Sequence, residues 1–141
     1  PAGAGAAGRS PMLDVGISGA EGVADAPPAA EVDRLVALAL AAACVEDGHG
    51  AIAFVDAERI ADLNAEHRSK AGPTDVLSFP IDGADASVPA DVRELGDVVI
   101  CPEHTTDLRE AIVHGVLHLV GMDHETDDGE MLALQAEILS W

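Results

Sequence analysis

Three histidines near the carboxyl end of the chain have a spacing that suits a metal ion. His114 and His118 are four residues apart, so on a helix at about 100° per residue both imidazoles project from one side. Gly121 follows and can adopt the left-handed conformation that ends a helix, so that His124 comes from the next turn as a third ligand. Three protein ligands leave one position for water, which is typical of catalytic zinc.

The same segment lacks the carboxylate that a metallopeptidase needs. Its spacing equals that of the metzincin helix, HExxHxxGxxH, but Gly115 stands where the peptidase carries its general-base glutamate. Composition alone would produce this arrangement of histidines and glycine in about one such chain per thousand. We therefore interpret the segment as a zinc-hydrolase site with one Zn²⁺ per chain, and peptide hydrolysis is a residual alternative.

Periodicity and turn signals predict the elements that position these histidines. Strands are expected at Leu13–Ser18, Ala51–Val55, Val76–Ile81 and Asp97–Cys101, with Pro80 favouring a strand edge or end. Helices are expected at Glu31–Val45 (ended by Gly48 and Gly50), Ala57 to about Glu66 (with Asp56 as N-cap), Leu108–Val120 and about Asp127–Leu139. In the last helix the expected core residues are Met131, Leu132, Leu134 and Ile138.

This β-α-β-α-β-β-α-α order predicts an α+β fold. We expect a small mixed four-stranded sheet covered by helices, with the zinc-binding HxxxHxxGxxH motif on a helix and the turn after it. The 141 residues suffice for one core. Residues 1–11 are Gly/Ala-rich and are expected to be a vector-derived or disordered lead, and 12–141 a single metal-dependent hydrolase domain.

Charge and apolar patterning limit the partners. Asp and Glu number 26 against 7 Lys and Arg, a net charge of −19, which excludes a general basic patch for nucleic acid. The sequence has no run of 18 apolar residues and its first residues show no signal-peptide pattern, so we expect a cytoplasmic protein without a membrane partner. The separated Cys44 and Cys101 are expected to be reduced thiols.

Three blocks of sequence resemble the YbeY family of bacterial endoribonucleases and ribosomal RNA maturation factors. They are HGVLHLVGMDH at 114–124, LNAEHR at 63–68 followed by PTDVLSFP at 73–80, and LGDVVIC at 95–101. With the final helix, the resemblance covers about Leu13 to Trp141. It implies a hydrolase of single-stranded RNA, not DNA, that matures small-subunit ribosomal RNA, serves ribosome quality control and works with the small ribosomal subunit or ribosome-associated proteins.

The resemblance also implies roles for individual residues. His114, His118 and His124 are the zinc ligands, and Arg68 is the catalytic basic residue, whose planar guanidinium would bind phosphate oxygens while metal-activated water attacks. Independently of the resemblance, Asp123 stands beside His124 in the sequence and is a candidate to orient a ligating histidine through a hydrogen bond. A surface ion pair is the alternative role for Arg68, and a helix-end or turn role for Asp123.

Two departures from the family keep a second function open. Only PEHTTDLREAIV separates Cys101 from His114, where the family leads us to expect a longer helix and loop. The acidic net charge opposes RNA binding. A ribosome-assembly factor with a mainly structural zinc and little RNA cleavage is therefore the alternative function.

Overall fold

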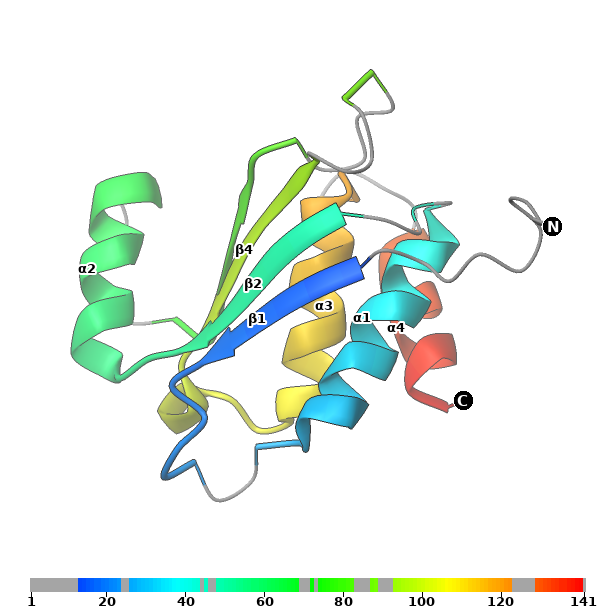
Figure 1. Ribbon diagram of the computed structural model, residues 1–141. Helices are drawn as coiled ribbons and strands as arrows, with labels where there is room; N and C mark the ends of the chain where they lie inside the picture. The colour runs from blue at the N-terminus through cyan, green and yellow to red at the C-terminus, as the bar shows by residue number, and fades with distance from the viewer. Residues whose placement is uncertain are drawn as a thin grey trace, which may run out of the picture.

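A mixed sheet of four strands forms the centre of the protein (Figure 1). The computed structural model describes residues 13–23, 26–43, 45, 48–68, 72, 74–82, 87–88, 93–122 and 129–140, with the backbone alone for Leu13 and Arg68. The elements in chain order are β1 (Leu13–Ser18), α1 (Ala29–Ala42), β2 (Gly48–Phe54), α2 (Ala57–Arg68), β3 (Val76–Pro80), β4 (Glu94–Ile100), a 3₁₀ helix (Pro102–His104), α3 (Leu108–Leu119) and α4 (Glu130–Ser140). The predicted α+β class and element order are confirmed.

The strands lie in the order β1-β2-β4-β3. β1 runs parallel to β2, and β2 parallel to β4, whereas β3 is antiparallel to β4. β3 is therefore an edge strand, and it ends at Pro80, which has no N–H to donate to a further strand. The sequence-based expectation for Pro80 is confirmed.

Helices cover both faces of this sheet. α1, α3 and α4 pack together on one face, whereas α2 stands apart on the other (Figure 1). Successive side chains of β4 point to opposite faces of the sheet, and this alternation supplies both helix layers. Val98 and Ile100 belong to the larger core under α3, whereas Val99 and the next residue but one, Cys101, belong to a smaller cluster under α2. α3 contacts α1, α4, β3 and β4, so the helix that carries His114 and His118 is the most central one.

No helix in the described part of the chain is long and apolar enough to cross a membrane. Cys101 is buried and its thiol is free, while Cys44 lies outside the described residues.

Several predicted boundaries are wrong, and tertiary contacts explain them. β2 begins at Gly48 rather than Ala51, because Gly48 pairs with Leu13 and Gly50 pairs with both Val15 and Gly96, so these glycines extend a strand instead of ending a helix. In addition, α1 spans Ala29–Ala42 rather than Glu31–Val45, α2 extends to Arg68, and β4 begins at Glu94 instead of Asp97.

One predicted core residue of α4 is also wrong. Leu132 is 48% exposed, whereas Gln135 is buried with Met131 and Ile138. These three positions are four and then three residues apart, so they share one helix face, and that face is turned towards the core.

Candidate metal centre

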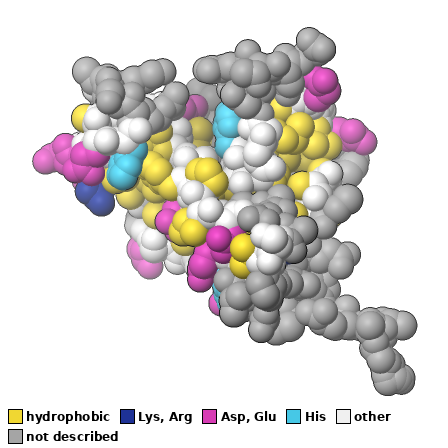
Figure 2. All heavy atoms as spheres, turned by 90° about the horizontal axis from the view of Figure 1, so that it is seen from above, with side chains coloured by type: hydrophobic (Ala, Val, Ile, Leu, Met, Phe, Trp, Pro, Cys, Tyr) yellow, Lys and Arg dark blue, Asp and Glu magenta, His cyan; other side chains and the backbone are white. Residues whose placement is uncertain are grey.

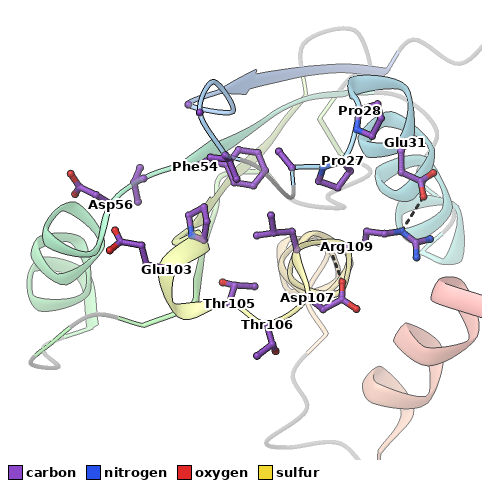
Figure 3. A pocket seen from close by; sticks show the side chains of 17 residues that line it. Pro27, Pro28, Glu31, Phe54, Asp56, Glu103, Thr105, Thr106, Asp107 and Arg109 are labelled. Atoms are coloured by element: carbon purple, nitrogen blue, oxygen red, sulfur yellow. Dashed lines mark hydrogen bonds and ion pairs between the residues drawn. The ribbon is translucent and has the colours of Figure 1, made fainter.

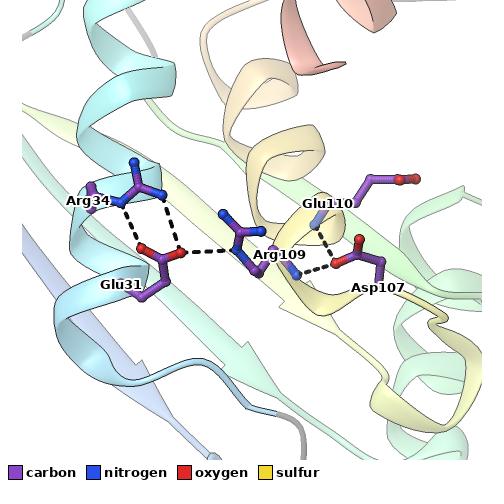
Figure 4. Close-up of polar contacts among 5 residues, drawn as sticks. All are labelled: Glu31, Arg34, Asp107, Arg109 and Glu110. Atoms are coloured by element: carbon purple, nitrogen blue, oxygen red, sulfur yellow. Dashed lines mark hydrogen bonds and ion pairs between the residues drawn. The ribbon is translucent and has the colours of Figure 1, made fainter. Parts of the chain in front are cut away.

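The first turn of α3 is capped by its own sequence. The side chain of Asp107 accepts hydrogen bonds from the backbone N–H groups of Arg109 (3.0 Å) and Glu110 (3.2 Å), as Figure 4 shows. A carboxylate at this position satisfies N–H groups that have no partner within the helix, and it also complements the positive end of the helix dipole. The short connection after Cys101 therefore still starts the histidine-bearing helix at a defined residue.

Glu31 joins the first turns of α1 and α3. Its carboxylate accepts hydrogen bonds from Nε of Arg34 at 2.7 Å and Nε of Arg109 at 3.0 Å (Figure 4). The hydrogen bond from Arg34, together with the charges of both arginines, lowers the pKa of Glu31, and the same hydrogen bond raises the pKa of Arg34. This charge network fixes the start of α3 against α1.

The last turn of α3 ends in a Schellman motif. Gly121 has a φ of 95°, and its N–H donates to the carbonyl of His118 at 3.0 Å. The N–H of Met122 donates to the carbonyl of Leu117 at 3.1 Å. These two bonds turn the chain back at the residue that the sequence predicted for this purpose.

The imidazoles of His114 and His118 converge on one side of α3. Their Nε2 atoms are 3.2 Å apart, and their ring centroids are 4.7 Å apart. Two imidazole nitrogens that each lie 2.0–2.1 Å from one tetrahedral ion are separated by about 3.3–3.4 Å. The observed separation therefore fits two ligands of a single zinc ion.

A residue that sequence reasoning missed contacts this pair from α4. Oε1 of Gln135 lies 2.8 Å from Nδ1 of His114, and the Gln135 side chain is 8% exposed. The spacing of residues in α4 could have identified Gln135, because position 135 lies on the same helix face as the core residues Met131 and Ile138. A buried polar side chain on an apolar helix face needs a hydrogen-bond partner, and the partner of Gln135 is His114.

Gly115 is explained by the packing of α3 on the sheet. A Cβ at this position would lie 2.4 Å from Cγ1 of Val98 and 3.4 Å from Oγ of Ser78. The Ser78 hydroxyl also donates to the Gly115 carbonyl at 2.9 Å. Position 115 thus faces β3 and β4 rather than the histidine pair, so a glutamate there would have no room to act as the peptidase base.

The remaining predicted site residues are not placed by the structure. Asp123 and His124 lie within 123–128, outside the described residues, and Arg68 is described only by its backbone at the end of α2. In the described ranges, no three His, Cys, Asp or Glu side chains are grouped so as to hold a metal ion. The third ligand and the phosphate-binding role of Arg68 stay predictions.

The motif that contains Arg68 is anchored beside the edge strand β3. The amide of Asn64, a residue that is only 4% exposed, donates to the Gly72 carbonyl at 3.0 Å and so ties α2 to the segment before β3. The ring of His67 packs edge-on against Phe79, with 4.9 Å between the centroids. These contacts hold the end of α2 along β3, the edge strand that α3 contacts from the other face of the sheet.

A small cavity of about 170 Å³ adjoins His114. Its lining includes His114, Gln135, His104, Glu110 and Asp75. Figure 2 shows the end of the molecule where α3 finishes, with histidine and apolar side chains in the upper half of the view and acidic side chains at its edges and in its lower middle. Among the described residues on this face, Lys and Arg side chains appear only at the margin.

A larger cavity of about 940 Å³ lies where β1 and β2 end, beside the first turns of α1 and α3 (Figure 3). Four of its lining residues are acidic: Glu31, Asp56, Glu103 and Asp107. Each of these carboxylates already accepts a hydrogen bond from a helix N-terminus or an arginine. The acidic lining of this cavity is thus used in capping and pairing helices.

Comparisons with known proteins agree with the architecture and the motifs. The family model for "Endoribonuclease YbeY" matches residues 28–141. Proteins named endoribonuclease YbeY from Salinispora tropica and Acinetobacter baylyi are 41% and 44% identical to this chain over 113 and 110 residues. These matches cover 64% and 67% of this chain and 72% and 69% of the relatives.

A similar protein from Rubrobacter xylanophilus is 42% identical over 95 residues, which cover 65% of this chain and 66% of that one. The solution structure of TM1509 from Thermotoga maritima has the same fold, with a TM-score of 0.51 and 24% identity over 92% of this chain and 87% of that one. The match to the family model and the identities above 40% lead to one conclusion: the chain belongs to the endoribonuclease YbeY family.

Proposed function

We propose that this chain is a zinc-dependent endoribonuclease that cleaves single-stranded RNA during maturation of small-subunit ribosomal RNA and in ribosome quality control. Its family consists of hydrolases of RNA phosphodiester bonds. The observation that best supports the metal is the 3.2 Å separation of Nε2 of His114 from Nε2 of His118. The ribosomal role rests on the family resemblance.

The chain's own residues divide the work of binding and orientation. His114 and His118 on α3 and His124 after the Schellman turn would hold the ion, and Asp123 would orient one of these histidines by a hydrogen bond. When bound, zinc supplies Lewis acidity that lowers the pKa of water and polarises a phosphoryl oxygen. Arg68 would bind the non-bridging oxygens of the scissile phosphate through its planar fork.

A ribosome-assembly factor with a mainly structural zinc is the second candidate. The observation that favours it is the acidity of the protein, which has a net charge of −19 and places Asp75 and Glu110 in the cavity beside His114. Either function would be carried out in the cytoplasm, with the small ribosomal subunit or a ribosome-associated protein presenting the RNA. Both candidates share the metal site and differ in RNA cleavage.

One experiment tests the metal and separates the two functions. Zinc content and cleavage of a single-stranded ribosomal RNA fragment are measured for the wild type, His118→Ala and Arg68→Ala, with His49→Ala as a histidine control. We expect about one zinc per chain in the wild type and His49→Ala, loss of zinc in His118→Ala, and reduced cleavage with full zinc in Arg68→Ala.

Each alternative result has a distinct meaning. Full zinc content in a His114→Ala/His118→Ala double variant would reject the ligand assignment. Zinc binding without RNA cleavage by the wild type, free or with small ribosomal subunits, would favour the assembly factor. If Arg68→Ala unfolds the protein while specific activity per folded molecule is unchanged, Arg68 forms a structural ion pair.

A further inference from the structure

Gln135 is one of two polar residues with a buried side chain among the described residues, the other being Asn64. Asn64 has a structural partner in the Gly72 carbonyl. Gln135 instead directs its amide at the metal-ligand candidate His114, 21 residues earlier in the chain, with 2.8 Å between Oε1 and Nδ1. The fully buried Met131 and Ile138 lie on the same face of α4 and fix the position of this amide.

An amide oxygen accepts hydrogen bonds and never donates them, so a bond to Oε1 requires the proton of a neutral His114 ring to be on Nδ1. The ring's lone pair is then on Nε2, which is the atom that faces Nε2 of His118 at 3.2 Å. Which ring nitrogen of a histidine can bind a metal is decided by the hydrogen bond that the other nitrogen makes.

We propose that Gln135 is a positioning residue that fixes the tautomer and the ring orientation of His114, so that Nε2 is presented to the metal before the metal binds. This inference rests on the proposed role of His114 as a ligand. It assigns α4 a part in the site: the buried face of α4 supplies the acceptor, and α3 supplies the ligand.

The choice of an amide rather than a carboxylate has a physical consequence for this chain. Glutamine accepts the Nδ1–H bond without adding negative charge, in a cavity that Asp75 and Glu110 already line. A polyanionic substrate would be repelled by a further carboxylate at this depth, where water screens charges poorly. Position 135 thus orients His114 at no electrostatic cost to RNA binding.

Three variants separate positioning from packing. Gln135→Met keeps the length of the side chain but removes the acceptor, and Gln135→Glu keeps an acceptor. Ile138→Val loosens the same face of α4 without touching His114 and serves as the matched control. The tautomer of His114 is read from long-range ¹H–¹⁵N NMR spectra of the metal-free protein, zinc affinity from competition with a chromophoric chelator, and folding from circular dichroism.

We expect Nδ1–H in the wild type, in Gln135→Glu and in Ile138→Val, and loss of this preference in Gln135→Met. Zinc affinity should fall roughly 10- to 100-fold in Gln135→Met and much less in Gln135→Glu and Ile138→Val. A wild-type His114 protonated on Nε2 would overturn the proposal, even if Gln135→Met fails to fold. Equal affinity losses in Gln135→Met and Ile138→Val would also overturn it, because packing alone would then explain both.

The NMR readout is independent of the proposed function. If the wild type binds no zinc, or if His114→Ala retains it, the ligand assignment fails while the tautomer of His114 still decides the role of Gln135. If zinc depends on His114 but the tautomer is unchanged in Gln135→Met, the ligand assignment stands and the positioning role is wrong.

Discussion

The hydroxyl of Ser78 donates a hydrogen bond of 2.9 Å to the carbonyl of Gly115, and this bond joins strand β3 to α3 between the two histidines His114 and His118. It exists because the absence of a side chain at Gly115 lets α3 approach the sheet to within contact of Val98. The close packing at Gly115 therefore fixes against the sheet the turn of α3 that carries His114 and His118.

Gly115→Ala should lower the free energy of unfolding by about 1–3 kcal/mol, because its Cβ would overlap Val98 and the helix must shift. Urea denaturation measures this loss, and zinc affinity should fall with it. Val98→Ala in the same chain should recover part of both. Gly16→Ala is the control, since no atom lies within 4 Å of a Cβ placed there. Equal stability of Gly115→Ala and Gly16→Ala would contradict the close approach.

Gly121→Ala should cost about 1–2 kcal/mol of stability for a different reason. A Cβ there meets no atom within 4 Å, but the φ of 95° is one that alanine adopts only with strain. The predicted ligand His124 follows this turn. Gly121→Ala should therefore lower zinc affinity more than a conservative core substitution that causes the same loss of stability. Thermal denaturation with and without zinc provides the measurement, and an unchanged midpoint would argue against a strained turn.

Glu31→Gln should reduce stability at pH 7, because it removes the carboxylate that pairs with Arg34 and Arg109. The pKa of Glu31 is lowered below its ordinary 4.5, so its contribution is fully present above that pH and is lost as the pH falls through the folded-state pKa. Denaturant midpoints of the wild type and Glu31→Gln should thus differ at pH 7 and approach each other well below pH 4.5.

The exposed carboxylate Glu137 on α4 supplies the comparison for this prediction. Glu137→Gln should change the midpoint at pH 7 less than Glu31→Gln does. A difference between wild type and Glu31→Gln that persists unchanged at acidic pH would show that the glutamine disturbs packing rather than an ion pair.

Binding to free RNA should depend only weakly on salt. With a net charge of −19 we expect only a few phosphate contacts, near Arg68 and the metal, and each contact adds about 0.7 to the slope of log affinity against log salt. With one to three contacts we expect a slope of about 1–2 in magnitude. A salt titration with a short single-stranded RNA, with and without small ribosomal subunits, tests this, and tight binding with a steep slope would reveal a basic groove.

Local signals in the sequence predicted most of the fold correctly. Asp56 caps α2 by accepting a hydrogen bond from the Arg59 N–H at 2.8 Å, and Gly121 ends α3, each as expected from residue type alone. The spacing of His114 and His118 predicted that their rings would converge, because four residues make about one helical turn.

The predictions that were wrong depend on contacts distant in sequence. Gly48 and Gly50 have poor strand propensity, but pairing with neighbouring strands makes them part of β2. Gln135 is not among the core residues that the sequence predicts for the last helix, and only the position of α4 against α3 shows that its partner is His114. The apolar Leu132 is expected in the core from its hydrophobicity, but the position of α4 leaves it 48% exposed.

The order of strands in the sheet also has a kinetic consequence. Residues 48–53 of β2 pair with 13–18 of β1, and Ile52 of β2 pairs with Val98 of β4, more than forty positions later in the chain. Closing such long loops is entropically costly before any contact compensates for it, so domains dominated by distant pairings fold slowly. α3 and α4, which are close in sequence, can meet before the sheet is complete. The helices that hold His114 and Gln135 would then associate early, and completion of the parallel strand pairs would limit the folding rate.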